Sequence, residues 1–344
     1  MLSAEEQASD RLFDGIAQGL ELVESAMREQ LGSDADVIGA LGNHVLSSGG
    51  KRLRPALVLL AADLCGYTGP RRIQLGAALE LLHTATLLHD DVVDFADLRR
   101  GRPSANAIWG NRRAVLAGDF FYSRASSMIV EDGNLEILEI FSQAIRLMAE
   151  GELLQLQRSF DTTVTEAHYY KVIDRKSATL LSAACEVGAV LGGVTRGEIR
   201  RVATFGRELG LAFQLRDDAL DYDAEAVDLG KPYCADLREG KVTLPLLLTL
   251  KRCTSGEREL ITSILKNASR LAEHALAGEP GPNDEQLETA PVLALIESHR
   301  GVEDTVRRAE EHVGNAISAI AAFPDGRAKS ALHSAAAFAV SRDR

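Results

Sequence analysis

The sequence predicts an all-α protein, and three observations support this fold class. No proline lies between Pro103 and Pro232, so nothing in this stretch forces a helix to stop. Apolar residues recur there at spacings of three and four, with charged residues between them, over residues 113–128, 136–157 and 199–222. Sustained alternation of apolar and polar residues, which marks half-buried strands, is scarce. We therefore expect long helices packed on one another.

Turn sequences rich in Gly, Pro, Asn and Asp divide the chain into helix-sized pieces. The polar stretch at residues 277–291 is expected to be a surface loop. The most apolar stretch, residues 177–194, contains Glu186 and many small residues, which favours a packed core helix over a membrane span. The turn sequences are GGKRLRP, GYTGPR, RRGRPSAN, EDGN, GGVTRGE, LGKPYCAD and FPDG.

Length and charge restrict the possible classes of protein. A chain of 344 residues can bury one large core or two modest ones. No linker or block of charge divides it, so we expect a single domain over residues 1–344. With 50 acidic and 38 basic residues the net charge is -12, which argues against a nucleic-acid-binding protein. Any anionic ligand must therefore be met by local cations.

The cysteines and the amino terminus indicate a cytoplasmic protein. The cysteines are far apart and form no CxxC pair, so neither a zinc site nor a disulfide framework is predicted. The first fifteen residues are acidic and lack the apolar core of a signal peptide, which argues against secretion. The four thiols, at Cys65, Cys185, Cys234 and Cys253, are expected to be reduced.

Three aspartates end the helix expected over residues 73–94. Asp90 and Asp94 are four residues apart and share a face, whereas Asp91 lies about 100° round the helix. Carboxylates are unfavourable here because they repel one another and meet the negative end of the helix dipole. Asp90 and Asp94 are therefore expected to be the main ligands of a cation, with Asp91 in support, and Asp97 receives no role.

Asp217, Asp218 and Asp221 repeat this spacing at the end of GRELGLAFQLRDDALD. One such triplet is equally well explained as a solvated acidic helix end. Two triplets, each after an apolar helix, favour a shared cavity where poor screening raises the cost of repulsion. Divalent cations would relieve it, and hard oxygen donors without a Cys or His pair favour Mg²⁺ over zinc or copper. Because Mg²⁺ is usually shared with substrate phosphates, a phosphate-bearing ligand between the triplets is expected.

Basic residues follow or precede both triplets in predicted turns. Arginine can bind phosphate oxygens in a bidentate manner, and glycines beside it allow the backbone to approach closely. Any one of these cations is more commonly a surface salt-bridge partner. Their joint placement favours phosphate binding by Lys51, Arg54, Arg99, Arg100, Lys231 and Lys241.

Four motifs in this order, GGKRLRP, LLHDDVVDFADLRRG, FQLRDDALD and DLREGKVTLPLL, make the chain similar to the trans-polyprenyl diphosphate synthases, the isoprenoid chain elongases. The resemblance covers nearly the full length. It implies a single-domain helical bundle around a deep central cavity, usually in a homodimer. It also implies Mg²⁺-dependent joining of an allylic diphosphate to isopentenyl diphosphate.

The resemblance implies roles for individual side chains. The aspartates of both triplets are similar to the Mg²⁺-binding groups that grip the allylic diphosphate, and Arg99 is similar to an arginine that binds it. His83, which would otherwise be interpreted as an ordinary core histidine, matches the isopentenyl diphosphate pocket together with Lys51, Arg54 and Arg100. Further groups around the allylic substrate align with Lys176, Ser177, Gln214, Lys231 and Lys241.

The chain departs from the family pattern at two places: Ser177 stands where threonine is commoner, and Cys234 and Ala235 replace a glycine and a polar residue. In the implied reaction, metal ions and cations stabilise the leaving diphosphate. The carbocation is attacked by the isopentenyl double bond, and pyrophosphate is the usual base. The Ser177 hydroxyl and the Gln214 amide would stabilise the cation in a dry cavity.

Product length in this family depends on what closes the cavity below the first triplet. Ala85 and Thr86 lie one helical turn below Asp90, about 5 Å deeper, where short-chain enzymes tend to carry an aromatic residue. These small residues predict that the growing chain continues toward Leu82, Leu79 and Ala78. We therefore expect a product of about C40 to C50, used as a quinone side chain.

A neighbouring helix could instead supply the floor of the cavity, through Phe120, Phe121 or Met128, and give a C15 or C20 product. A non-catalytic subunit of a heteromeric synthase is a further alternative, although such subunits tend to lose one aspartate motif. A terpene cyclase usually has an Asn, Ser and Glu pattern in place of DDALD. A long product must also leave for lipid, so transient membrane contact is expected, although no amphipathic anchor is evident.

Overall fold

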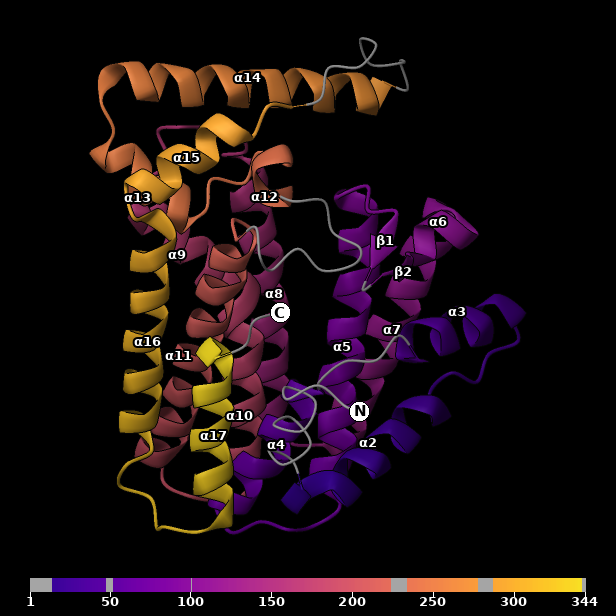
Figure 1. Ribbon diagram of the computed structural model, residues 1–344. Coiled ribbons are helices and arrows are strands. Elements are labelled where there is room, and N and C mark those ends of the chain that lie inside the picture. Colours follow the sequence, from indigo (N-terminus) through magenta and orange to yellow (C-terminus); the bar gives the residue numbers. More distant parts are fainter. Residues whose placement is uncertain (1–13, 48–51, 100, 224–233, 278–286, 342–344) are drawn as a thin grey trace, which may run out of the picture.

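The protein is almost entirely helical in the parts that the structure describes, as predicted (Figure 1). This computed structural model describes residues 14–47, 52–99, 101–223, 234–277 and 287–341. The elements are η1 (Asp14–Ile16), α2 (Ala17–Glu29), α3 (Asp36–Ser47), α4 (Leu53–Leu64), α5 (Arg71–Val93), β1 (Leu98–Arg99), β2 (Arg102–Pro103), α6 (Ala105–Trp109), α7 (Asn111–Asp132), α8 (Leu135–Leu156), α9 (Glu166–Ile173), the π-helical turn η2 (Asp174–Ala178), α10 (Thr179–Leu191), α11 (Arg196–Leu220), α12 (Ala235–Arg238), α13 (Leu244–Arg252), α14 (Ser255–Ala277), α15 (Ala290–Ser298), α16 (Gly301–Ala319) and α17 (Arg327–Ser341).

Capping side chains explain where the long helices begin and end. Thr195 and Glu198 form a capping box at the start of α11, in which each side chain bonds to the backbone N–H of the other residue. Asn134 caps α8 by accepting from two backbone N–H groups. Gly133, with a φ of 77°, ends α7 in the left-handed conformation that glycine tolerates. The predicted turns at EDGN and GGVTRGE are therefore confirmed.

Several predicted boundaries were wrong. Residues 177–194 were expected to form one helix, but regular helix covers only Thr179–Leu191 and follows a π-helical turn. The expected loop at 277–291 is too long at both ends, because Ala277 belongs to α14 and α15 begins at Ala290, where Pro291 suits a first turn. The turn RRGRPSAN contains a two-stranded hairpin that sequence periodicity could not reveal, since each strand has two residues.

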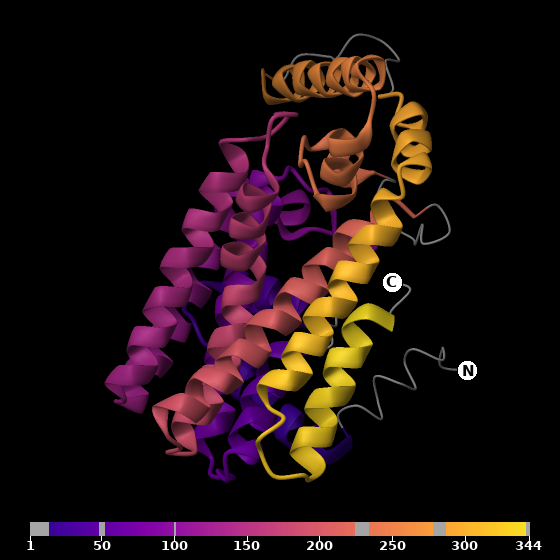
Figure 2. The same ribbon diagram turned by 90° about the vertical axis from the view of Figure 1, so that its left-hand side faces the viewer.

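The helices of the first half enclose an apolar core around α5. Helix α5 packs along α7 and α4, and α10 packs against α4, α8 and α11. Gly188 allows the close approach of α10 to α4, because a Cβ there would lie 2.6 Å from the carbonyl oxygen of Val58. Figure 2 shows α16 running beside α11 along the length of the bundle, which the contacts of these helices confirm.

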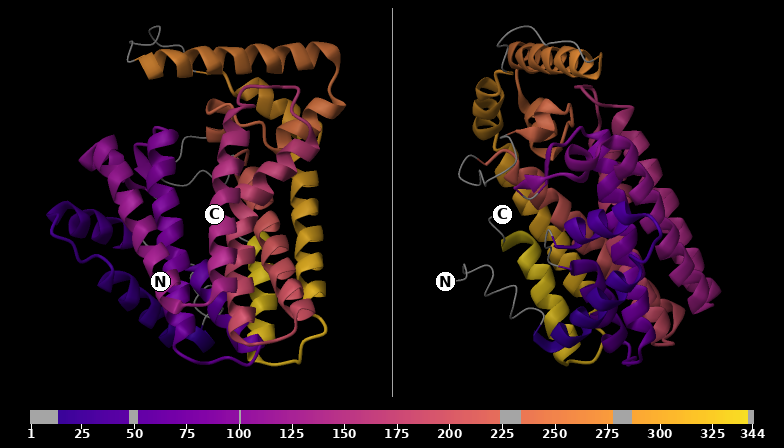
Figure 3. Two further views of the ribbon diagram at one scale, coloured as in Figure 1. Left: turned by 180° about the vertical axis from the view of Figure 1, so that it is seen from behind. Right: turned by 90° about the vertical axis from the view of Figure 1, so that its right-hand side faces the viewer.

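A second apolar cluster joins the end of α11 to α9, α12, α13 and α16, with α14 and α15 against it. Helix α14 lies across one end of the bundle (Figure 3). Because α11 contributes to both clusters, it connects the two halves of the core. Single-domain organisation over residues 1–344 remains a prediction.

No helix in the described ranges is long and apolar enough to cross a membrane. Ala184, Cys185 and Gly188 of α10 are buried against other helices. The expectation that residues 177–194 supply a core helix is therefore confirmed.

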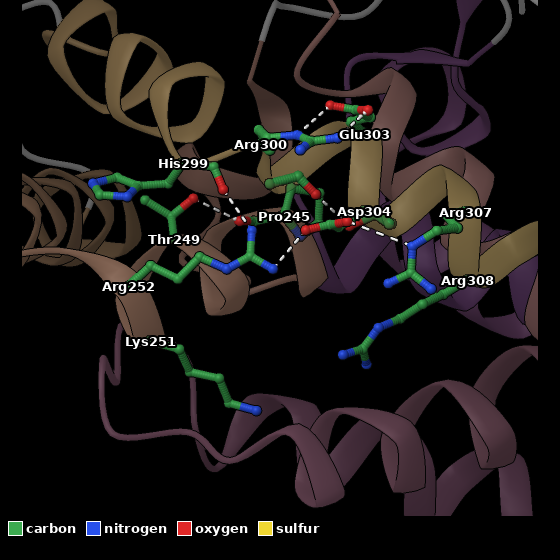
Figure 4. A network of polar contacts seen from close by, with 12 residues as sticks. Pro245, Thr249, Lys251, Arg252, His299, Arg300, Glu303, Asp304, Arg307 and Arg308 are labelled. Atoms are coloured by element: carbon green, nitrogen blue, oxygen red, sulfur yellow. Dashed lines mark hydrogen bonds and ion pairs between the residues drawn. The ribbon is translucent and has the colours of Figure 1, made fainter.

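A polar network ties α9, α13 and α16 together near the second cluster. Arg252 of α13 donates at 2.5 Å to the His299 carbonyl oxygen and at 2.5 Å to Asp304 of α16 (Figure 4). Lys251 and Arg308 extend toward each other in the same view, and both bond to Glu166 in the first turn of α9. Glu166 therefore anchors α9 to two other helices.

Replacing Glu166 by Gln should weaken this anchor in a pH-dependent way. Burial raises the pKa of Glu166, but the bonds and charges of Arg308 and Lys251 outweigh burial and lower the pKa overall. A carboxyl whose pKa is lowered on folding stabilises the protein above its unfolded pKa, and this contribution disappears as pH falls through the folded pKa. We expect the advantage of wild type over Glu166→Gln, about 1 kcal/mol near neutral pH, to vanish between about pH 5 and pH 2.

Urea unfolding followed by circular dichroism at several pH values measures this difference. Glu310→Gln, at an exposed position of α16, is the matched control and should follow wild type. A constant difference between wild type and Glu166→Gln across the acid range would show that the ion pairs do not anchor α9.

Candidate active site

Both aspartate triplets lie at the carboxyl ends of their helices, and these ends point toward the same end of the bundle (Figure 1). Lys241 lies between the two regions. Its Nζ is 3.4 Å from Asp94 Oδ2, and its backbone N–H donates to the carbonyl oxygen of Asp236, beyond the second triplet. Nearby carboxylates raise the pKa of Lys241 although burial opposes this, so it stays charged. The Lys241 ammonium, which also pairs with Glu239, thus reaches the first triplet, while its backbone is bonded to the segment that follows the second.

The first triplet contains carboxylates in two kinds of surroundings. Asp91 is buried, and its Oδ1 accepts from Arg99 Nε at 2.5 Å across the hairpin. Asp90 is half-buried, and its pKa is raised to about 6: burial is the largest cause, the charges of Glu152 and Asp94 also raise the pKa, and those of Lys176 and Arg99 lower it. The charged form of Asp90 is therefore disfavoured, and a bound cation would stabilise it. Asp91 is already paired with Arg99.

In the second triplet Asp218 is buried and fully engaged. Its Oδ1 accepts from Gln214 Nε2 at 2.7 Å, and its Oδ2 accepts from the Tyr169 hydroxyl at 2.5 Å. Burial raises the pKa of Asp218 to about 7, although these two hydrogen bonds lower it, and the neighbouring aspartates add to the increase. Asp218 is thus held by the protein itself.

The other two members of this triplet differ from Asp218. Asp221 accepts from the backbone N–H groups of Ala235 and Asp236, both at 3.1 Å, and so fixes the start of α12. Ala235, one of the departures from the family pattern, thus bonds to the triplet through its backbone. Asp217 is the exposed member of the triplet.

The π-helical turn η2 presents Lys176 and Ser177 to this site. Lys176 Nζ lies 2.6 Å from Glu152 Oε2 and 3.2 Å from Gln155 Oε1, both on α8. Ser177 Oγ donates to Gln214 Oε1 at 2.6 Å. π-helical turns often occur at functional sites, and here the turn brings two predicted residues against α8 and α11.

In the motif GGKRLRP, Arg52 is a residue that sequence reasoning did not assign to the site, and its bonds fix the start of α4. Arg52, just before α4, has a φ of 46° and bonds to Glu24 at 3.1 Å, to Glu80 at 3.3 Å and to the Leu46 carbonyl oxygen at 2.8 Å. Arg54 follows in the first turn of α4, half-buried. Its neighbour in the motif, Lys51, lies outside the described residues, as do Arg100 and Lys231.

Most of the predicted chain-length residues are buried. Ala85 and Leu82 are each 1% exposed, and Leu79 and Ala78 have no exposed surface, because α7 packs along this part of α5. Only Thr86 is half-buried; its hydroxyl donates to the carbonyl oxygen of His83, which is also half-buried. The route past Leu82, Leu79 and Ala78 and the deep cavity both remain predictions.

The donor set fits Mg²⁺. Among the described residues, no three carboxylate, histidine or cysteine side chains are grouped so that they could hold a metal ion by themselves. Asp91 and Asp218 are engaged with protein donors. The carboxylates of both triplets are hard oxygen ligands, and Mg²⁺ commonly needs only one or two of them beside water and phosphate.

Sequence reasoning missed Tyr169, Gly151, Glu152 and Arg52. Tyr169 and Asp218 are 49 residues apart, so no local pattern links them. Glu152 looks like an ordinary charge in an amphipathic helix. Only tertiary packing shows that Tyr169 contacts Asp218 and that Glu152 contacts Lys176.

The sequence is similar to those of known proteins along most of its length. The family model described as polyprenyl synthetase matches residues 35–277. The octaprenyl diphosphate synthase of Escherichia coli K12 is 43% identical over 97% of this chain and 99% of its own length. The all-trans-nonaprenyl-diphosphate synthase (geranyl-diphosphate specific) of Rhodobacter capsulatus is 38% identical over 92% of this chain and 93% of its own.

A solved structure agrees with these relatives. The polyprenyl synthase from Caulobacter crescentus CB15, complexed with calcium and isoprenyl diphosphate, has a TM-score of 0.88 and 40% identity, covering 98% of both chains. The fold and these comparisons define a helical prenyltransferase. The chain belongs to the polyprenyl synthetase family, which confirms the resemblance found in its motifs.

Replacing Gly151 by Ala should displace η2. A Cβ at Gly151 would lie 2.8 Å from the Lys176 backbone nitrogen and 2.9 Å from Arg175 Cβ. Because backbone cannot yield cheaply, we expect a loss of about 1–3 kcal/mol of unfolding free energy. A shift of Lys176 and Ser177 should also lower turnover at least about tenfold.

Gly314→Ala is the matched control for this substitution. Gly314 lies in helix α16 with no atom within 4 Å of its Cβ position, so alanine should be neutral or slightly stabilising. Urea unfolding and steady-state turnover of both variants measure the effect. Equal behaviour of the two variants would refute close packing of α8 on η2.

Proposed function

We propose that the protein is a Mg²⁺-dependent trans-prenyltransferase that adds isopentenyl diphosphate repeatedly to an allylic prenyl diphosphate and releases a chain of about C40 to C50. Both aspartate triplets lie at one end of the bundle, and the observation that carries this proposal is the interaction of the first triplet there with the charges of Arg99, Lys176 and Lys241. Such a site can hold a diphosphate only if metal ions and cations balance the carboxylates.

Mg²⁺ is assigned to the six aspartates of the two triplets. Asp90 and Asp94, which share a face of α5, and the exposed Asp217 are assigned direct contact. Asp91, Asp218 and Asp221 are assigned supporting roles, because they accept from Arg99, from Tyr169 with Gln214, and from the backbone of α12. When bound, Mg²⁺ acts as a Lewis acid on the departing diphosphate.

The chain's cations bind and orient the two diphosphates. Arg99, Lys176 and Lys241, with Lys231 outside the described residues, are assigned to the allylic diphosphate. Arg54 and His83 are assigned to isopentenyl diphosphate, together with Lys51 and Arg100 outside the described residues. Fixed positive charge stabilises the diphosphate as its C–O bond breaks.

Gln214 and Ser177 are assigned to the allylic cation. Their oxygens lie 2.6 Å apart, beside the second triplet. The isopentenyl double bond attacks the cation and forms the new C–C bond, and the departing pyrophosphate accepts the proton that is lost. No side chain is assigned as the base.

Two considerations support a long product for quinone side chains. Ala85 and Thr86 are small, so no aromatic ring closes the first helical turn below Asp90. The relatives from Escherichia coli and Rhodobacter capsulatus are octaprenyl and nonaprenyl diphosphate synthases. Since Leu82 and Leu79 are packed in the core, the long chain requires these side chains to move during elongation.

We also propose a cytoplasmic homodimer that contacts membrane transiently when it releases its product. Helices α7 and α8 expose large apolar side chains, a pattern that favours burial against another chain. The most exposed are Leu116, Val130, Leu135 and Leu153.

Product sizing tests the proposed function. Purified protein is incubated with farnesyl diphosphate, labelled isopentenyl diphosphate and Mg²⁺, and the dephosphorylated products are separated by length. We expect chains of C40 to C50 and no turnover with EDTA. A dominant C15 or C20 product would refute the long-chain assignment and favour a floor formed by Phe120, Phe121 or Met128. Absence of turnover in homogeneous protein would favour a partner subunit.

Replacing Ala85 by Phe should shorten the product to about C15 to C20, because the ring would close the cavity one turn, about 5 Å, below Asp90. The variant is expected to lose about 1–3 kcal/mol of unfolding free energy, since Ala85 is buried. Ala85→Leu, which is smaller, should shorten the product less. Thr86→Ala is the control and should leave product length unchanged; a full-length product from Ala85→Phe would exclude this face from the path.

A further inference from the structure

We propose that Tyr169 is a positioning residue of this reaction, which acts through Asp218 to fix the orientation of the Gln214 amide and, through that amide, the direction of the Ser177 hydroxyl. The inference rests on the proposed function, which places Gln214 and Ser177 beside the allylic cation. Tyr169 itself contacts neither substrate nor metal in this account.

Three hydrogen bonds in series carry the inference. The Tyr169 hydroxyl donates to Asp218 Oδ2 at 2.5 Å, and Gln214 Nε2 donates to Asp218 Oδ1 at 2.7 Å. Ser177 Oγ then donates to Gln214 Oε1 at 2.6 Å. The series connects α9 to α11 and α11 to η2, so three separate elements are aligned by four side chains.

The chemistry of the donors and acceptors gives the series a direction. The Gln214 group that faces Asp218 Oδ1 is its NH₂, which donates at 2.7 Å while the Tyr169 hydroxyl donates to Oδ2. The opposite orientation would place Gln214 Oε1 against Asp218 Oδ1, with lone pairs on both atoms. Because the NH₂ faces Asp218, the carbonyl oxygen faces Ser177 and takes its only hydroxyl proton. The lone pairs of both oxygens remain to stabilise positive charge.

Tyr169 limits the freedom of this arrangement. The terminal torsion of aspartate is broad, so a carboxylate held only by Gln214 could rotate. The tyrosine hydroxyl fixes the second oxygen of Asp218 and stops this rotation. Tyr169 is 5% exposed and Asp218 is 3% exposed, so water does not easily replace a lost bond.

Ion pairs to neighbouring helices hold α9, the helix that carries Tyr169, in place. Glu166, one turn earlier in α9, bonds to Lys251 of α13 and Arg308 of α16. The hydroxyl is therefore placed by packing outside the active site. This explains why Asp218 faces the protein while its neighbour Asp217 is exposed. Preorganised dipoles of this kind stabilise developing charge without reorganisation.

Tyr169→Phe tests the inference, with Tyr170→Phe as the matched control. Tyr170 lies beside Tyr169, with ring centroids 5.5 Å apart, but its ring packs toward His312 outside the proposed site. We expect Tyr169→Phe to lower kcat about tenfold or more and to leave the KM for isopentenyl diphosphate within about twofold of wild type. Tyr170→Phe should match wild type in both constants.

A double-mutant cycle with Gln214→Leu separates positioning from structure. If Tyr169 acts through the amide, Tyr169→Phe causes no further loss of kcat in the Gln214→Leu background. If the losses of kcat in the two single variants multiply in the double variant, the inference is overturned. A wild-type kcat in Tyr169→Phe would overturn it as well. Loss of folding in Tyr169→Phe, monitored by circular dichroism, would assign the tyrosine to core stability instead. A wild-type protein without turnover would overturn the proposed function, and this inference with it.

Discussion

The rest of the structure depends on electrostatic repulsion among carboxylates held at two helix ends. The carboxyl end of a helix disfavours negative charge, yet α5 and α11 each end in three aspartates. The packed helices around α5 and α11 do not let these ends move apart. Burial is the main reason that the pKa of Asp90 is raised to about 6 and that of Asp218 to about 7. Ionising these carboxyl groups therefore costs more free energy in the protein than in water. A site of this kind is stable only with cations, and it binds anions only through them.

Groups of the protein itself stabilise part of this negative charge, and they do so to different degrees for different aspartates. Arg99 is paired with Asp91, Tyr169 and Gln214 hold Asp218, and backbone N–H groups hold Asp221. Lys241 Nζ, 3.4 Å from Asp94, neutralises part of the charge on the first triplet. The six carboxylates therefore differ in how firmly the protein holds them, and Asp91, Asp218 and Asp221 are fixed by the bonds named above.

Local sequence patterns predicted the helices and the positions of the aspartates, whereas the partners of the aspartates depend on tertiary packing. Helical periodicity and turn residues gave the long helices, and the i, i+4 spacing gave the shared face of Asp90 and Asp94. The hairpin, the π-helical turn and the burial of the residues below Ala85 depend on neighbouring helices, which no local window contains. The partners of the aspartates were missed for the same reason: Tyr169 meets Asp218 across 49 residues, and Glu152 meets Lys176 only because Gly151 lets α8 approach η2.

We propose that Asp90, Asp94 and Asp217 bind metal while Asp91 keeps its bond to Arg99 and Asp218 keeps its bond to Tyr169. A crystal structure with Mg²⁺ and a non-reactive allylic diphosphate analogue tests this assignment. We expect Mg²⁺ beside Asp90, Asp94 and Asp217, with the bonds from Arg99 to Asp91 and from Tyr169 to Asp218 retained. Metal bound by Asp218 with its tyrosine bond broken, or a diphosphate held by cations without metal, would contradict it.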